Sequence, residues 1–159
     1  MLARSKQRAL ITSWSSDNGE TWTPVAKSGL PNNNSGTDAV SLSDGRQLLV
    51  YNHVYPHDTL KNGKGPRTPL NVSVSRDGKT WFASLILEDS PISQYSYPSV
   101  IQSADGMVHV VYTWRREKIK YVKIDPSKLT LTKIAKGQWP KYKGYVAPKL
   151  GEVTDDPLM

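Results

Sequence analysis

The chain has 159 residues, of which 37% are hydrophobic and 22% charged, so it is predicted to fold as one domain. No apolar run is long enough to span a membrane, and the absence of cysteine excludes disulfides and thiolate metal sites. The net charge is +7, and residues 115–149 contain eleven Lys or Arg against two acidic residues. This basic region is either a solvated face or a surface that attracts anions. Nucleic acid is not an expected partner, because no recognised motif accompanies the charge.

Taken in chain order, the first predicted element is a strand over residues 9–14, which leads into the pattern S-x-D-x-G-x-T-W at residues 15–22. A form of this pattern with one residue fewer recurs sixty residues later, at residues 75–81. A second pattern, an Asp-Gly pair between two apolar runs, recurs with an offset of 61, at residues 39–51 and 100–112. Two unrelated patterns with nearly the same period indicate a repeat protein.

Each repeat is predicted to contain two hairpins. The Asp-Gly pairs supply the positive φ of a tight turn. In the other pattern, the Asp side chain accepts hydrogen bonds from backbone N–H groups, and the Trp packs beneath the turn. Two hairpins give about four short strands per repeat, the size of a β-propeller blade, and predict an all-β fold. Pro126 to Leu131 could form one helical turn, and the repeat fades after Asp125.

The two S-x-D-x-G-x-T-W elements resemble the Asp-box (BNR) repeats of the sialidase (neuraminidase) superfamily, and the resemblance extends over about residues 11–125. It implies a partial β-propeller with Asp-box hairpins, similar to the C-terminal blades of a six-bladed propeller. At about sixty residues per blade, the chain supplies about two and a half four-stranded blades. We therefore expect propeller blades over residues 1–125 and a C-terminal extension, partly loop, over residues 126–159.

An incomplete propeller leaves strand edges and half-buried faces exposed. The first strand of this chain resembles the third strand of a blade, so the two strands that precede it in the family are missing. We therefore expect either a fragment of a longer product or a homo-oligomer in which several copies complete the ring.

The same resemblance implies a set of catalytic residues. Sialidases use a tyrosine nucleophile, because a neutral phenol avoids repulsion with the carboxylate of sialic acid. Tyr97 lies at the matching offset before Asp105, and Tyr95 is the fallback; the alternative is an aromatic residue that lines the channel without reacting. Arg67, before the second Asp box, resembles one of three arginines that bind the substrate carboxylate, or is an ordinary loop arginine. The other two arginines and the acid/base aspartate belong to blades that this chain lacks.

Further candidates lie where predicted strands end in loops, because propeller sites are built there. Asp38 opens the inner strand of the first Asp-Gly repeat and is a candidate polar residue of the catalytic centre. The candidate substrate-binding residues follow the second strands of the two repeats: Asn52, His53, Trp114 and Arg115. His53 could act as an acid or base, although a lone histidine is more often structural. Trp114 beside arginines suits stacking on a sugar and binding an anionic group, and the alternative is a solvated loop.

The combined interpretation is a sialidase-like glycoside hydrolase that acts on terminal acidic sugars, with weak or no activity of the chain alone. The rival hypothesis is a non-catalytic carbohydrate- or protein-binding propeller built from the same blades. Thr113 weakens the catalytic case, because sialidases commonly have an acidic residue there. The expected partner is an acidic glycan, with no cofactor, no metal and no membrane. Basic residues 1–8 precede no apolar segment, so no secretory signal is expected and the compartment stays open; a full-length parent could be secreted or periplasmic.

Overall fold

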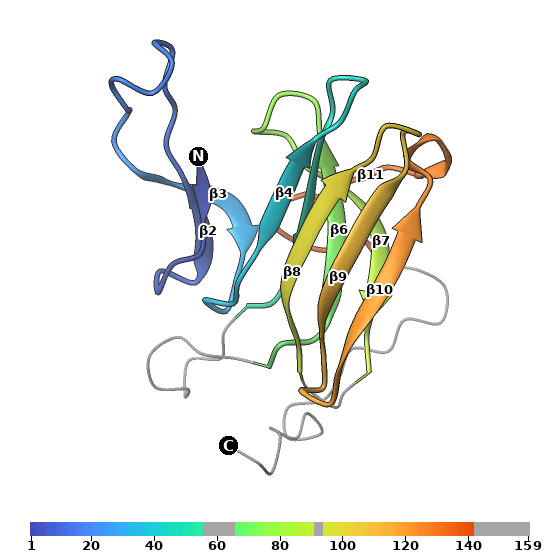
Figure 1. The fold of residues 1–159 in the computed structure, drawn as a ribbon. Helices are drawn as coiled ribbons and strands as arrows, with labels where there is room; N and C mark the ends of the chain where they lie inside the picture. The colour runs from blue at the N-terminus through green and yellow to red at the C-terminus, as the bar shows by residue number, and fades with distance from the viewer. Residues whose placement is uncertain (56–65, 91–93, 142–159) are drawn as a thin grey trace.

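The computed structural model describes residues 1–55, 66–90 and 94–141. Over these residues the fold is all-β, as predicted, with three antiparallel sheets and no α-helix. The same residues contain no helix that could cross a membrane. Figure 1 shows the three sheets side by side, with the central sheet between the other two.

The first sheet has the order β1-β2-β3. Its strands are β1 (Leu2–Ala3), β2 (Ala9–Thr12) and β3 (Ala26–Pro31). β2 and β3 pair antiparallel on either side of residues 15–22, which confirms the first predicted hairpin of the S-x-D-x-G-x-T-W type. We call the turns at residues 15–22 and 75–81 the Ser-Asp turns.

The central sheet has the strand order β11-β7-β6-β5-β4. Its main strands are β4 (Asp38–Ser41), β5 (Gln47–Tyr51), β6 (Leu70–Ser75) and β7 (Phe82–Glu88). Each of these strands pairs antiparallel with its neighbour in the chain, which makes a four-stranded meander. The β4–β5 hairpin closes at the first Asp-Gly pair and the β6–β7 hairpin at the second Ser-Asp turn. Both predicted hairpins of this repeat are therefore confirmed.

The third sheet has the order β10-β9-β8. Its strands are β8 (Tyr95–Gln102), β9 (Val108–Trp114) and β10 (Lys118–Ile124). The β8–β9 hairpin closes at the second Asp-Gly pair, as predicted. The pairing of β8 with β9 shifts register between Ser96 and Ser99, so the strand is irregular around Tyr97.

The chain returns to the central sheet after the third sheet. Asp125 caps a single turn of 3-10 helix, Pro126–Lys128, by accepting a hydrogen bond from the Ser127 N–H (3.0 Å), which confirms the predicted helical turn. β11 (Thr132–Lys133) then pairs with β7. Residues 142–159 of the predicted extension lie outside the described residues, and the predicted boundary at residue 125 stays a prediction.

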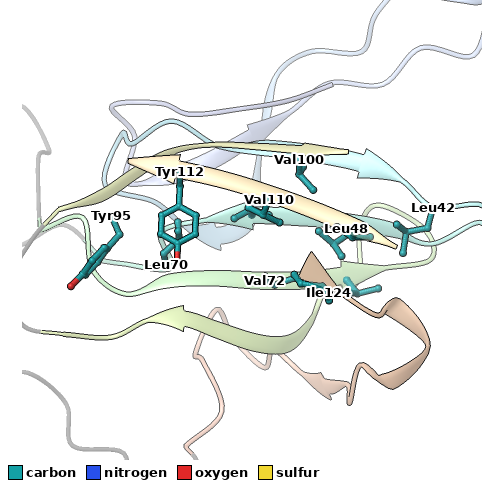
Figure 2. Close-up of a cluster of buried hydrophobic side chains, with 12 residues drawn as sticks. Leu42, Leu48, Leu70, Val72, Tyr95, Val100, Val110, Tyr112 and Ile124 are labelled. Atoms are coloured by element: carbon teal, nitrogen blue, oxygen red, sulfur yellow. The ribbon is translucent and has the colours of Figure 1, made fainter. Parts of the chain in front are cut away.

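Two apolar clusters connect the three sheets. Strand alternation directs Leu48 and Val50 to one face of the central sheet and Leu49 and Tyr51 to the other, and all four side chains are fully buried. The first pair packs against the third sheet, in the cluster that Figure 2 shows. The second pair packs against the first sheet, where Leu10 is also fully buried. Each such side chain contributes roughly 1.5–3 kcal/mol, so β5 stabilises both interfaces.

A carboxylate closes each Ser-Asp turn. Asp17 accepts hydrogen bonds from the Ser15 hydroxyl (2.6 Å) and the Thr21 N–H (2.9 Å), and these bonds lower its pKa. Asp77 accepts a hydrogen bond from the Thr80 N–H (2.6 Å), which likewise lowers the pKa of Asp77. Hydrogen bonds to the ionised form have this effect because protonation would weaken them. The turns are therefore stabilised by the charged carboxylates.

The tryptophans of the two Ser-Asp turns differ in burial. Trp81 is 6% exposed and packs in the cluster between the first and central sheets. Trp22 is 51% exposed, although its indole N–H donates to the Gly19 carbonyl (3.0 Å) of its own turn. Trp22 therefore lies against its own turn, as predicted, but remains half exposed and belongs to neither apolar cluster, whereas Trp81 is buried between two sheets.

Candidate functional site

The strands run between two ends of the molecule. One end, here called the turn end, contains both Ser-Asp turns and both Asp-Gly turns, at the top of Figure 1: residues 15–22, 43–46, 75–81 and 103–106. The opposite end, here called the loop end, contains, within the described residues, segments 4–8, 32–37, 52–55, 66–69, 89–90, 94–97 and 115–117. The predicted catalytic pair, Tyr97 and Arg67, lies at the loop end.

Hydrogen bonds connect the segments of the loop end to one another. Four of them link neighbouring segments: Arg4 Nη1 to the Asn34 carbonyl (3.4 Å), Asn33 Nδ2 to the Pro66 carbonyl (2.7 Å), Tyr95 N–H to the Arg67 carbonyl (2.9 Å), and Arg115 N–H to the Gln94 carbonyl (2.6 Å). Segments that are far apart in sequence therefore form one continuous surface.

Tyr97 projects from the irregular part of β8 and is 56% exposed. Its φ of 51° lies in the left-handed region, which is uncommon for a residue other than Gly, Asn or Asp. Pro98 contributes to the irregularity, because it has no N–H for the strand ladder. The Arg67 guanidinium carbon lies 5.0 Å from the centroid of the Tyr97 ring. An exposed phenol on a strained backbone is typical of a functional position.

Arginines surround the Tyr97 phenol. A hydrogen bond from Arg67, together with the charge of Arg67, lowers the pKa of Tyr97. The charges of Arg4 and Arg116 lower this pKa further, by smaller amounts, while burial opposes the shift. Among the described residues no carboxylate contributes to the shift. The arginines therefore stabilise the ionised form of the phenol relative to an ordinary tyrosine, and their charges attract anions.

The turn between β9 and β10 places two more arginines at the loop end. The Glu117 N–H donates to the Trp114 carbonyl (3.0 Å), and Arg115 and Arg116 have φ values of 53° and 57°. The Arg115 guanidinium carbon lies 5.0 Å from the centroid of the Trp114 ring, and the Lys118 ammonium lies 4.5 Å from it. Two cations of the chain itself therefore contact the ring that was predicted to stack on a sugar, and that stacking stays a prediction.

Asp38 and Asn52 bond to backbone groups of neighbouring segments. Asp38 Oδ2 accepts a hydrogen bond from the Val100 N–H (2.8 Å), which joins the central sheet to the third sheet. Asn52 is fully buried, and its amide donates to the carbonyls of Pro69 (2.9 Å) and Tyr95 (3.0 Å). Both side chains thus help to position β8, from which Tyr97 projects. Direct contact of either residue with substrate stays a prediction.

His53 is 8% exposed and lies among other buried groups. Its Nδ1 is 2.5 Å from the Tyr51 hydroxyl, and its Nε2 is 2.8 Å from the Gly137 carbonyl oxygen. The Trp139 ring packs edge-on against the imidazole. Burial lowers the pKa of His53 to about 4. With both ring nitrogens already bonded, His53 fits the structural interpretation, and we do not include it in the proposed site.

The structure brings Tyr97 and Arg67 into contact, and their catalytic roles stay a prediction. Tyr95, the fallback nucleophile, is 1% exposed and unsuited to reaction. Sequence analysis missed Arg4, and it considered Arg116 only as one of the two arginines beside Trp114. No motif marks Arg4, whereas the position of Arg116 next to a predicted binding residue was a usable signal.

Comparisons with known proteins agree with this architecture. The family described as a BNR repeat-like domain matches residues 1–110, more than half of the chain. Among solved structures, a lysine-to-glycine mutant of NanB sialidase from Streptococcus pneumoniae is similar, with a TM-score of 0.60 and 18% sequence identity over 81% of this chain. The chain covers 22% of that sialidase, and no curated protein matches it. The chain belongs to the BNR repeat-like domain family.

Proposed function

We propose that the loop end is a sialidase-like glycosidase site for a terminal acidic sugar, with Tyr97 as nucleophile and Arg67 as a ligand of the substrate carboxylate. One observation carries this proposal: an exposed phenol lies against a guanidinium, 5.0 Å from guanidinium carbon to ring centroid, and its pKa is lowered. In sialic acids the carboxylate is attached to the anomeric carbon. A carboxylate on Arg67 would therefore bring the anomeric carbon close to the Tyr97 oxygen.

In the proposed reaction, the Tyr97 phenol loses its proton to water, its oxygen attacks the anomeric carbon, and the bond to the aglycone breaks as the aglycone oxygen takes up a proton. Water then hydrolyses the glycosyl–tyrosine intermediate, and Tyr97 recovers its proton. Arg67 binds the substrate carboxylate and stabilises the phenolate that attacks. The leaving oxygen needs a proton donor, yet the groups that shift the Tyr97 pKa are arginines. The carboxylate of Asp38 already accepts a hydrogen bond from the Val100 N–H, so we do not assign Asp38 as this proton donor. We therefore expect this chain to bind an acidic sugar and to turn it over weakly or not at all.

We further propose that the three sheets are part of a β-propeller with Asp-box hairpins. The four-stranded meander β4–β7 has the composition of one blade. The internal repeat supports further blades. Val40 and Val50 of the central sheet pack against the third sheet. The equivalent residues of the third sheet, Ile101 and Val111, are 59% and 39% exposed. An equivalent sheet, from a longer chain or from a second copy, would cover these residues. Light scattering of the purified chain tests whether a second copy covers these residues. A monomer in solution would contradict self-association.

Titration calorimetry with N-acetylneuraminic acid tests the binding site directly. We expect measurable binding, and no comparable binding of the neutral sugar galactose. Arg67→Lys should weaken binding by about tenfold, because an ammonium cannot form the two parallel hydrogen bonds of a guanidinium. Arg76→Lys is the matched control, since Arg76 is exposed at the turn end and should not affect binding.

Hydrolysis of a fluorogenic sialoside tests catalysis separately. Any turnover by the unaltered chain should disappear in Tyr97→Phe. Binding that is unaffected by Arg67→Lys, or no binding at all, would refute the proposed site. Binding by a chain that shows no hydrolysis even at high protein concentration would instead favour the non-catalytic carbohydrate-binding hypothesis.

A further inference from the structure

The β9–β10 turn at the loop end has an unusual composition. Its central residues, Arg115 and Arg116, both have positive φ values, 53° and 57°. Tight turns with positive φ at both central positions favour Asn and Gly, because a Cβ atom is disfavoured in the left-handed region. Two arginines therefore make the turn less stable than Asn-Gly would. Strain of this kind indicates a role for the side chains.

A buried glutamine fixes the orientation of Arg116. Gln94 is 2% exposed, and its side-chain carbonyl accepts a hydrogen bond from Arg116 Nε at 3.0 Å. The main-chain carbonyl of Gln94 accepts from the Arg115 N–H at 2.6 Å, and the next residue, Tyr95, donates its N–H to the Arg67 carbonyl at 2.9 Å. The Arg116 guanidinium is thus attached to the stretch of chain that also supports Arg67.

The two arginines of the turn have different surroundings. Arg115 contacts the Trp114 ring, and its Nε lies 3.5 Å from the Glu117 carboxylate. Arg116 is exposed, and among the described residues no acidic side chain forms an ion pair with it. Because Gln94 uses Nε, the two Nη groups of Arg116 remain for a ligand. Arg116 therefore suits anion binding better than Arg115 does. The sequence analysis had named Arg115 as the candidate binding residue.

Arg116 lies near Tyr97, but it is not among the residues in closest contact with the phenol. The charge of Arg116 lowers the pKa of Tyr97, but less than the charge and hydrogen bond of Arg67 do. Arg115 and Lys118 add positive charge at the same turn, where both contact the Trp114 ring. A sugar bound at Tyr97 would thus have a second cationic position next to it.

We propose that Arg116, positioned by Gln94, binds the anionic group of a second acidic sugar next to the one at Tyr97, so that the site prefers glycans with two adjacent acidic sugars. This inference rests on the proposed function, because it places the terminal acidic sugar at Tyr97 and Arg67. Arg116 is then a specificity-determining residue, and Gln94 is a positioning residue.

Titration calorimetry with N-acetylneuraminic acid and with its linked dimer tests the inference. The unaltered chain should bind the dimer about tenfold more tightly than the monomer, as one extra charge-assisted pair predicts. Arg116→Gly should remove most of that preference while changing Tm by less than about 2 °C, because relief of the positive φ offsets the lost hydrogen bond to Gln94. Gln94→Met should also lower the preference, with Arg116 still present. Loss of the preference with Tm retained would distinguish a binding role of Arg116 from a purely structural one.

Lys136→Gly provides a matched control, because Lys136 is also an exposed cation with positive φ, 50°, in a different turn. It should raise Tm and keep the preference for the dimer. Equal affinity of the unaltered chain for both sugars, or an unchanged preference in Arg116→Gly, would overturn this inference. The proposed function would then still stand if Arg67→Lys weakens the binding of both sugars. Failure of the unaltered chain to bind either sugar would overturn both.

Discussion

The turn end and the loop end reverse the chain with different residues. At the turn end, positive φ values fall on glycines such as Gly45, Gly78 and Gly106, and on Asn18, a residue type that tolerates this region. At the loop end they fall on Tyr97 and on the two arginines of the β9–β10 turn, for which the left-handed region is unfavourable. The turn end is therefore relaxed, and the loop end is strained.

The charges of the two ends differ in the same way. At the turn end cations lie beside carboxylates, as in the pairs Arg46–Asp44 (2.6 Å) and Lys123–Asp105 (3.5 Å). At the loop end Arg115 also lies 3.5 Å from the Glu117 carboxylate, but the charges that act on the Tyr97 phenol are those of arginines. Strain at one end is compatible with a folded protein only if the rest of the structure is stable enough. The comparison thus assigns stability to the turn end and function to the loop end.

The largest effect on stability that we expect comes from His53. This residue tests the assignment of stability to the turn end, because it is a buried structural residue near the loop end. Its pKa is about 4 in the folded chain and about 6.5 when unfolded. Between these values only the unfolded chain binds the proton, so lowering the pH from 6.5 to 4 should reduce the free energy of unfolding by up to about 3 kcal/mol. Urea denaturation at pH 7, 5.5 and 4 measures this change.

His53→Gln should be less stable at pH 7 but should lose most of the dependence on pH in this interval. A dependence that persists in this variant would show that other groups cause it. In that case His53 would contribute little to stability, and the assignment of stability to the turn end and function to the loop end would be strengthened.

A smaller effect is expected from glycines of the turn end. Gly78 has φ +66°, and a Cβ there would lie 2.6 Å from the Trp14 ring, so Gly78→Ala should cost about 2 kcal/mol. Gly106 has φ +80° but no atom within 4 Å of such a Cβ, so Gly106→Ala should cost about 1 kcal/mol, from backbone strain alone. Urea denaturation of both variants gives the difference. Equal costs would mean that Trp14 moves freely and that the turn end is less rigid than the contacts indicate.

The hairpins could be predicted because their signals are local. Asp44-Gly45 and Asp105-Gly106 each lie between two apolar runs, and tight turns need only the residues within them. The Ser-Asp turns are equally local, since Asp17 bonds to residues within four positions of it. Fold class and most strand positions follow from such patterns.

The rest depends on contacts between segments that are distant in sequence. Nothing near Arg4 indicates that it lies at the same end as Tyr97, because that placement requires the first sheet to pack on the central one. The burial of His53 depends on Gly137 and Trp139, which reach it only after the chain has passed through the third sheet. Arg67 and Tyr97 were each marked as candidates by the family resemblance, and not by any local pattern, and their contact follows only from the structure.

The smallest change in stability, with a clear effect on function, is expected from Gly36→Ala at the loop end. A Cβ at this position would lie 3.1 Å from Cδ1 of Tyr97, so the ring would have to shift by a few tenths of an ångström, which would alter its present contact with Arg67. Because Tyr97 is exposed, this movement should change the free energy of unfolding by less than about 0.5 kcal/mol. Affinity for N-acetylneuraminic acid should nevertheless fall severalfold, since binding depends on how the phenol and the guanidinium are placed together.

Calorimetry and urea denaturation of the same Gly36→Ala preparation measure both quantities. In an Arg67→Lys background the added alanine should weaken binding much less, because the two changes disturb one contact and their effects are not additive. Unchanged affinity in Gly36→Ala would mean that the position of the Tyr97 ring does not matter for binding. A loss of stability as large as that of Gly78→Ala would mean that the loop end is packed as tightly as the turn end, and the functional assignment would then lose its main physical support.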